Sequence, residues 1–271
     1  MTIKLGINGF GRIGRLALRA ALKHGFTDIQ IVGINDPKPA DYLAYMLKYD
    51  SVHGRFDGTV DFTDDALIVN GKKIKLSHER DAHNLRWGEM GVHTVLECTG
   101  HYLTEPTSQM HLAAGAKKVV ISAPSKDSIP MFVYGVNHKK YAGEAIISNA
   151  SCTTNCLAPV VKVIHEGLGI RHGAITTLHD LTNTQSILDT PHKDLRRARA
   201  SGMSLIPTTT GSATAIMAAT LPSMAANRAV FPSRARAVSA VSRCTRSIPS
   251  RSIRRRAPTR TARPATFAPA P

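Results

Sequence analysis

Glycines at positions 9, 11 and 14 separate an apolar stretch from a segment with helical periodicity. Residues Ile3 to Asn8 have the composition of a buried parallel strand, and apolar residues recur at helical spacing from Gly11 to His24. A strand, a Gly-x-Gly-x-x-Gly turn and a helix in this order begin a dinucleotide-binding unit, because the turn lets the backbone approach a pyrophosphate at the helix N-terminus. This feature predicts an α/β fold with a Rossmann-type doubly wound parallel sheet.

The segment after this helix strengthens that interpretation. A second apolar strand is predicted from Ile29 to Ile34, and Asn35 and Asp36 follow it directly. Asp36 stands at the distance beyond Gly14 where an acidic side chain binds the hydroxyls of the adenine ribose. A free carboxylate at this position would repel a ribose 2′-phosphate, so the sequence predicts NAD rather than NADP as the cofactor.

Alternating strands and helices are predicted for the rest of the first half. Asn70-Gly71 indicates a type I′ turn between two short strands. The strand predicted from Thr94 to Cys98 ends at Thr99, and cofactors bind at such C-terminal strand ends in this architecture. The remaining expected elements are a helix and loop over 41–56, short strands near 59–62, 67–70 and 73–76, a helix from Thr104 to Ala114 and a strand from Lys118 to Ile121.

A second distinctive segment contains Cys152. A strand is predicted from Ala145 to Ile147, and helical periodicity runs from Leu157 to about Gly167. A thiol at the mouth of a helix lies near unpaired backbone N–H groups and the positive end of the dipole, which favour the thiolate. We therefore expect Cys152 to have a lowered pKa and to act as a nucleophile. The neighbouring hydroxyls that suit an oxyanion or a phosphate are those of Ser151, Thr153 and Thr154.

The composition argues against membrane, metal-binding and nucleic-acid-binding proteins. No apolar run is long enough to span a membrane, no secretory signal precedes the first strand, and the four cysteines form neither a disulfide framework nor paired metal-ligand spacing. The net charge of +16 would suggest nucleic acid, but residues 217–271 contain eleven Arg and no acidic residue. Residues 1–216 then carry 24 basic and 19 acidic residues, which is an ordinary charge balance for a cytoplasmic enzyme. The lack of a disulfide framework likewise leads us to expect a reducing cytoplasm.

Several motifs together resemble those of glyceraldehyde-3-phosphate dehydrogenases. The resemblance covers residues 3–216 and implies an NAD-binding Rossmann domain over 1–151, followed by a truncated α+β catalytic domain over 152–216. The segments that carry the resemblance are residues 7–15, 35–37, 49–56, 97–100, 121–127 and 146–159.

The resemblance also implies a reaction and the residues that perform it. Glyceraldehyde 3-phosphate would be oxidised and phosphorylated by a homotetramer with NAD as hydride acceptor. Cys152 would be the nucleophile, and His179, at the end of the strand expected from Gly173, would be the base. NAD contacts are implied for Gly9, Gly11, Arg12, Ile13, Gly14, Asp36, Arg80, Thr99 and Ser122, and contacts to substrate and phosphate for Ser151, Thr153, Thr182, Thr210 and Gly211.

From Met217 the sequence changes character. Most residues from there to the end are Ala, Arg, Pro or Ser, a composition that cannot bury enough apolar surface to offset chain entropy. We therefore expect residues 217–271 to be a disordered or frameshifted tail without strands. The family's Arg for the substrate phosphate and Asn for the nicotinamide carboxamide have no counterpart there, so the resemblance implies a poor catalyst.

Four alternatives fit the same residues. Residues 178–185 and 210–216 resemble a subgroup linked to arsenate resistance, in which arsenate replaces phosphate as the attacking anion. Erythrose 4-phosphate would use the same thiol chemistry as the triose phosphate. A non-functional fragment that binds NAD weakly or not at all is a third alternative. The fourth is a non-specific polyanion binder that works through the Arg-rich tail, which has few aromatic residues for stacking on bases.

Overall fold

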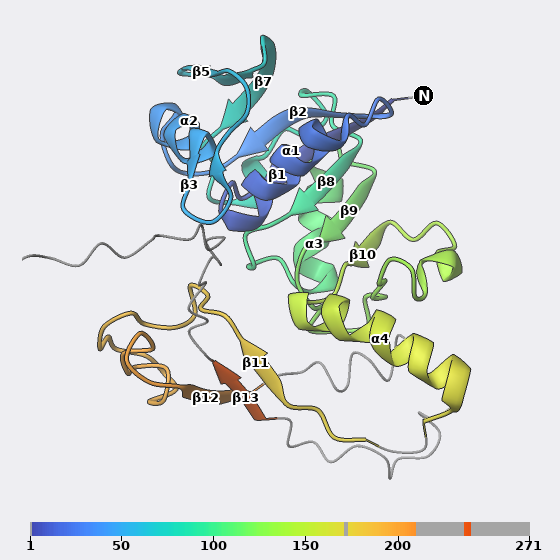
Figure 1. Ribbon diagram of the computed structural model, residues 1–271. Coiled ribbons are helices and arrows are strands. Elements are labelled where there is room, and N and C mark those ends of the chain that lie inside the picture. The colour runs from blue at the N-terminus through green and yellow to red at the C-terminus, as the bar shows by residue number, and fades with distance from the viewer. Residues whose placement is uncertain (1, 171–172, 210–235, 240–271) are drawn as a thin grey trace, which may run out of the picture.

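The computed structural model describes residues 2–170, 173–209 and 236–239, and is built around one eight-stranded sheet (Figure 1). Six strands of this sheet are parallel, and two antiparallel strands extend one edge. This arrangement confirms the predicted Rossmann-type α/β fold. The order across the sheet is β10 (Ile146–Ser148), β9 (Lys118–Ile121), β8 (Thr94–Glu97), β1 (Ile3–Asn8), β2 (Ile29–Asn35), β7 (Lys72–Ser77), β6 (Ala66–Val69) and β5 (Val60–Thr63).

Helices cover both faces of this sheet. Leu96 of β8 packs in a core with Leu18 of α1, whereas its neighbour Val95 packs in a second core with Met110 of α3. Successive strand side chains point to opposite faces, so α1 and α3 lie on opposite sides of the sheet. The helical elements around it are α1 (Arg12–His24), α2 (Ala40–Lys48), α3 (Glu105–Ala113) and the single turns η1 (Ala82–Asn84) and η2 (His138–Lys140).

Three short hairpins complete the first half of the chain, and one of them pairs β5 with β6. The hairpin between β6 and β7 turns at Asn70 and Gly71, whose φ angles of 51° and 75° confirm the predicted type I′ turn. The third hairpin joins β3 (Tyr49–Asp50) to β4 (Gly54–Arg55) within the region expected to be a helix and loop.

Helix α4 (Cys152–Leu168) follows β10 and begins earlier than the sequence predicts. The expected start at Leu157 is wrong, because Ser151 caps the helix: its hydroxyl accepts a hydrogen bond from the Thr154 N–H at 3.1 Å. Such a cap stabilises a first turn whose own residues have low helix propensity. Cys152 is therefore the first residue of the helix.

A second, three-stranded sheet follows α4 in the chain. It contains β11 (Thr177–His179), β12 (Ile206–Thr209) and β13 (Arg236–Ser239), with β13 in the middle. The strand expected from Gly173 is therefore shorter than predicted, and the expectation that residues 217–271 contain no strand is wrong at β13. The two neighbours of β13 supply the backbone hydrogen bonds that its own sequence pattern does not reveal. Within the described ranges, no helix combines the length and apolarity needed to cross a membrane.

Candidate active site and cofactor pocket

A pocket lies at the C-terminal ends of four adjacent parallel strands, β8, β1, β2 and β7. Its volume is about 560 Å³. Five of the nine residues predicted to contact NAD line it, from the four segments that follow these strands. The lining residues are Asn8, Gly9, Gly11, Asn35, Asp36, Pro37, Glu79, Arg80, Cys98, Thr99, His101 and Tyr102.

The three glycines have different local reasons to be glycine. Gly9 has a φ of +90°, and a Cβ on it would lie 2.8 Å from the Thr99 side chain. A Cβ on Gly14 would lie 2.3 Å from the carbonyl oxygen of Gly9, a contact that no rotamer change relieves. A Cβ on Gly11 would meet no atom within 4 Å, but it would occupy the pocket that Gly11 lines. Glycine is thus required at positions 9 and 14 for the turn to pack, whereas at position 11 it leaves space for a ligand.

This difference predicts opposite behaviour for two alanine variants. Gly14→Ala should reduce the free energy of unfolding by about 3 kcal/mol or more, because the new methyl group meets backbone. Gly11→Ala should cost about 1 kcal/mol or less, mainly through a poorer helix N-cap, yet weaken dinucleotide binding at least tenfold. Thermal unfolding and titration with NAD measure both effects. Equal stability losses in the two variants would contradict this account of the turn.

The Asp36 carboxylate is not free, which corrects the expectation from the sequence. Its Oδ2 accepts a hydrogen bond from the Phe10 N–H at 2.9 Å, and its Oδ1 accepts one from the Lys38 N–H at 3.0 Å. Asp36 thereby ties the glycine turn to the end of β2. Each carboxylate oxygen can accept a second hydrogen bond, so the group keeps the capacity to bind ribose hydroxyls.

The remaining predicted NAD contacts differ in their placement. The Arg12 guanidinium pairs with Asp50 at 2.8 Å, and Arg12 is not among the residues that line the pocket. Ile13 is 50% exposed at the same helix start. Ser122 follows β9, where its N–H donates to the Glu97 carbonyl and its hydroxyl contacts the Cys98 thiol.

The thiol at the start of α4 faces an imidazole from the second sheet. Cys152 Sγ lies 3.4 Å from His179 Nε2, and His179 stands at the end of β11. The other ring nitrogen, Nδ1, lies 2.7 Å from the Asp180 carbonyl oxygen. Because a carbonyl only accepts hydrogen bonds, Nδ1 carries the proton and Nε2 is left to accept the thiol proton. The structure thus brings together two residues that are 27 positions apart in the sequence.

The pKa values of this pair shift in the direction that favours a thiolate. Burial by itself raises the pKa of Cys152, but the hydrogen bond and charge of His179, together with Thr153, outweigh it, and the pKa is lowered. The hydrogen bond to the Asp180 carbonyl, followed by the contact with Cys152, raises the pKa of His179. By contrast, burial raises the pKa of Cys98 to about 11. Cys152 therefore differs in environment from the cysteine in the cofactor half.

The residues predicted to bind substrate and phosphate are only partly described. Ser151 and Thr153 flank Cys152 at the start of α4. Thr182 follows His179 closely in the chain, with its hydroxyl 2.9 Å from that of Thr184. Thr210 and Gly211 lie outside the residues that the structure describes.

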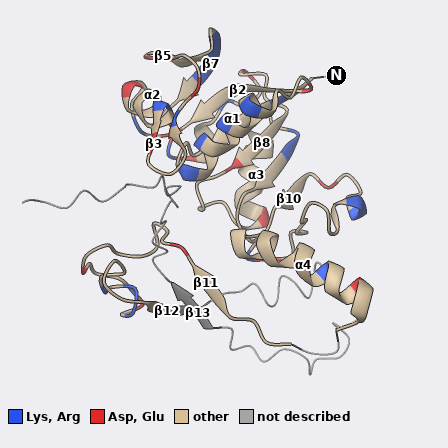
Figure 2. Cartoon of the chain, viewed as in Figure 1, with Lys and Arg blue, Asp and Glu red and all other residues tan. Residues whose placement is uncertain are grey.

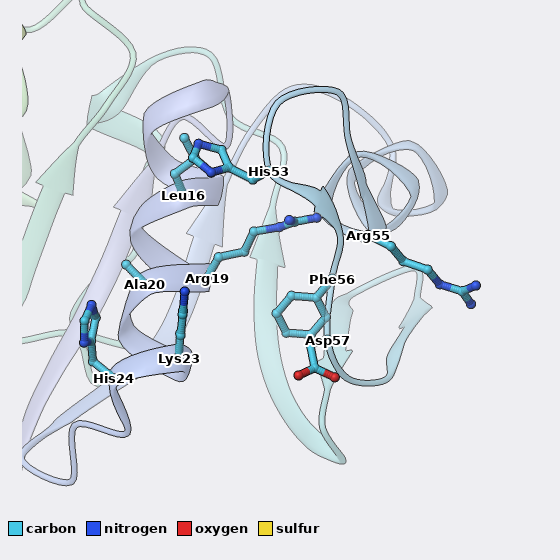
Figure 3. A pocket seen from close by; sticks show the side chains of 9 residues that line it. All are labelled: Leu16, Arg19, Ala20, Lys23, His24, His53, Arg55, Phe56 and Asp57. Carbon is cyan, nitrogen blue, oxygen red and sulfur yellow. The ribbon is translucent and has the colours of Figure 1, made fainter. Parts of the chain in front are cut away.

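A second hollow, of about 530 Å³, has a basic lining but belongs to no predicted site (Figure 3). It lies between α1 and the 53–57 segment, where Arg19 reaches across from the helix. The Arg19 guanidinium donates to the carbonyls of Leu47 and Gly54 and stacks on the Phe56 ring, so it holds the β3–β4 hairpin against α1. Basic and acidic residues are interspersed over the described chain rather than gathered on one face (Figure 2).

Comparisons with known proteins agree with this geometry. Residues 3–105 match the family model described as glyceraldehyde 3-phosphate dehydrogenase, NAD binding domain, and residues 151–229 match the C-terminal domain model of the same family. The chain belongs to the glyceraldehyde-3-phosphate dehydrogenase family. It is 59% identical over 217 residues to glyceraldehyde-3-phosphate dehydrogenase A of Escherichia coli and 60% identical over 215 residues to the enzyme of Bacteroides fragilis. These matches cover 80% and 79% of the chain, and the chain spans 65% of the length of each relative.

The family match also extends beyond the end of the resemblance inferred from the sequence. Residues 217–229 of the expected tail fall within the C-terminal domain model. In the cofactor half, sequence reasoning missed the contributions of Asn8, Asn35 and Glu79 to the pocket. Polar residues at the ends of two predicted apolar strands were the available signal for Asn8 and Asn35.

Proposed function

We propose that this family member catalyses NAD-dependent oxidation and phosphorylation of glyceraldehyde 3-phosphate through a thioester on Cys152. The 3.4 Å contact between Cys152 Sγ and His179 Nε2 is the observation that carries the proposal. A nucleophile beside a base, with the base oriented by a third group, is the arrangement required for covalent catalysis. Here the Asp180 carbonyl orients the imidazole.

The residues present supply the following steps. His179 Nε2 accepts the thiol proton, and the Cys152 thiolate attacks the aldehyde carbon. His179 returns that proton to the former carbonyl oxygen, which completes the hemithioacetal and leaves Nε2 free to accept again. His179 then takes the proton from the hemithioacetal hydroxyl while the carbon loses a hydride. NAD, when bound, supplies the hydride acceptor. Inorganic phosphate attacks the resulting thioester, which releases 1,3-bisphosphoglycerate and restores the Cys152 thiolate.

Other residues hold the reactants in place under this proposal. The glycine turn and Asp36 fit the pyrophosphate and adenine ribose of NAD, because Gly11 opens the pocket and the turn is tied to the carboxylate. Arg80 and Thr99 line the same pocket. We assign the attacking phosphate to Ser151, Thr153, Thr210 and Gly211, and the substrate's own phosphate to Thr182.

A single-turnover experiment tests this function. The purified chain mixed with glyceraldehyde 3-phosphate and NAD, without phosphate, should produce about one equivalent of NADH per active Cys152. Adding phosphate or arsenate should then release the acyl group, and the faster of the two anions identifies the acceptor. We expect slow steady-state turnover, because the match to the family's C-terminal domain model ends at residue 229. Erythrose 4-phosphate in the same assay tests the tetrose alternative, and absence of NADH with both sugars would refute the proposal.

The Asp36 carboxylate should select NAD. Asp36→Ala should weaken NAD binding by about 1.5–3 kcal/mol, because it removes a charged contact to the ribose and the anchor of the Phe10 N–H. The affinity for NADP should fall less, so the difference in affinity between NAD and NADP should become smaller. Asp41→Ala removes an exposed carboxylate from the first turn of α2 and serves as the matched control. Unchanged NAD and NADP affinities in Asp36→Ala would reject this role.

We also propose a domain boundary between Ser151 and Cys152, a homotetrameric assembly and a location in the cytoplasm. The start of the C-terminal domain match at residue 151 supports the boundary. The free thiols of Cys98, Cys152 and Cys156 fit a reducing compartment. Native mass spectrometry tests the assembly directly.

A further inference from the structure

The last residues of four adjacent parallel strands are joined by their side chains. Ser77 of β7, Asn35 of β2, Asn8 of β1 and Glu97 of β8 are also register partners along the sheet. The linking hydrogen bonds measure 2.9 Å between Ser77 and Asn35, 2.8 Å between Asn35 and Asn8, and 2.6 Å between Asn8 and Glu97. We call these four residues the strand-end ladder. It runs directly beneath the cofactor pocket, which Asn8 and Asn35 also line.

The hydrogen bonds of the ladder all run in one direction. The Ser77 hydroxyl donates to Asn35 Oδ1, Asn35 Nδ2 donates to Asn8 Oδ1, and Asn8 Nδ2 donates to Glu97 Oε2. A carboxylate only accepts hydrogen bonds, so Glu97 requires the amide nitrogen of Asn8 to face it. That choice turns Asn8 Oδ1 toward Asn35 and fixes the orientation of the next amide. Glu97 therefore sets the donor-to-acceptor direction of all three hydrogen bonds in the ladder.

The Glu97 carboxylate also accepts a hydrogen bond from the His111 ring, which is a neutral imidazole and not a cation. Trp87 Nε1, which can only donate, lies 3.2 Å from His111 Nδ1, so the proton of this ring is on Nε2. His111 Nε2 donates to Glu97 Oε2 at 3.1 Å. On the other oxygen, Oε1, Glu97 accepts from the Thr99 N–H at 2.7 Å and from the Thr99 hydroxyl. Four donors thus surround a carboxylate whose side chain is 0% exposed.

These contacts connect three walls of the pocket. Thr99 forms the wall after β8, and Asn8 forms the wall after β1. Asn35 fixes the wall after β7, because it donates to the Glu79 carbonyl and accepts from the Glu79 N–H, both at 2.9 Å. One buried acceptor therefore determines the side-chain orientations on which these three segments depend.

We propose that Glu97 is a positioning residue that presets the cofactor pocket through the strand-end ladder and Thr99. The role rests on the proposed use of NAD in this pocket. Glu97 does not line the pocket. It acts by keeping Thr99 and Asn8 in the side-chain conformations that bind a dinucleotide. A carboxylate is needed because both of its oxygens accept. A glutamine would turn an NH2 group toward either the two Thr99 donors or the Asn8 and His111 donors, and two hydrogen bonds would be lost.

The test compares Glu97→Gln with Thr94→Val. Thr94 is buried at the opposite end of β8, where its hydroxyl lies 2.8 Å from His93 Nδ1, so its loss perturbs the same strand away from the pocket. Three quantities are measured in the full chain: amide hydrogen exchange at Thr99, the NMR signal of the indole N–H of Trp87, which is the chain's one tryptophan, and the Kd for NAD. In Glu97→Gln, Thr99 exchange should accelerate at least tenfold, the indole signal should shift, and NAD should bind at least tenfold more weakly. Thr94→Val should change none of the three beyond twofold.

The outcomes separate this role from the proposed function. If the parent chain binds NAD and Glu97→Gln binds it equally well with Thr99 still protected, the positioning role is wrong although the cofactor assignment stands. If the parent does not bind NAD, the cofactor assignment fails, and Thr99 exchange alone decides whether Glu97 orders the wall. If Glu97→Gln does not fold, Ser77→Ala replaces it, because Ser77 belongs to the ladder without lining the pocket. Its NAD affinity should fall about threefold, and an unchanged affinity would overturn the proposal.

Discussion

Iodoacetamide at pH 7 is expected to alkylate Cys152 at least a hundredfold faster than Cys98. The reagent reacts with the thiolate, and burial raises the pKa of Cys98 to about 11, which leaves about one thiolate in ten thousand at this pH. The pKa of Cys152 is lowered instead, because the contact with His179 and Thr153 outweighs its partial burial. Peptide mass spectrometry over a time course gives both rates in one sample.

Two controls separate the effect of His179 from simple exposure. Cys156 is an exposed thiol one turn further along α4, so it reports the reactivity of an accessible cysteine on the same helix. In His179→Gln the pKa of Cys152 should rise, because the group that lowers it is removed. The pH at which alkylation reaches half its maximal rate should therefore move upward. Equal rates at Cys152 and Cys98, or an unmoved midpoint in His179→Gln, would contradict the thiolate assignment.

Replacing the nucleophile should have the largest effect on catalysis. Cys152→Ser should reduce NADH formation from glyceraldehyde 3-phosphate by at least about a thousandfold, because a serine hydroxyl beside a single imidazole is a far weaker nucleophile than a thiolate. His179→Gln should reduce it by about 10²–10⁴-fold through loss of the proton acceptor. Absorbance of NADH in a rapid-mixing experiment measures both.

The same variants should leave the cofactor pocket intact. Cys152 and His179 do not line it, so NAD titrations of both variants should match the parent within twofold. Retained NADH formation in Cys152→Ser would show that another group forms the covalent intermediate. Loss of NAD binding in that variant would show that the two sites depend on each other more closely than the contacts indicate.

The local patterns of the sequence were sufficient for the cofactor half of the fold. A Gly-x-Gly-x-x-Gly turn between a strand and a helix admits few architectures, and the clash of a Gly14 Cβ with the Gly9 carbonyl explains why the pattern is so restrictive. The Asn70-Gly71 turn was equally predictable, because both residues must adopt positive φ. Such features depend on neighbours in the chain and can be recognised without a structure.

Features that depend on distant partners were not predictable in the same way. The first turn of α4 has low intrinsic helix propensity, and the hydrogen bond from the Thr154 N–H to Ser151 determines where the helix begins. The strand β13 exists through its pairing with β11 and β12. Asp36 was expected to be free, but its partner, the Phe10 N–H, lies 26 residues away. The register of β1 against β8 likewise places Asn8 beside Glu97, which the order of residues alone does not show.

Mass spectrometry of the acid-quenched reaction tests the central claim most directly. The chain is mixed with glyceraldehyde 3-phosphate and NAD in the absence of phosphate, quenched, digested and mapped. The Cys152–His179 geometry predicts a 3-phosphoglyceroyl thioester on Cys152 that requires NAD, disappears when phosphate is added, and does not form in Cys152→Ser. NADH formation without an acyl group on Cys152, or an NAD-dependent acyl group on another cysteine, would contradict it.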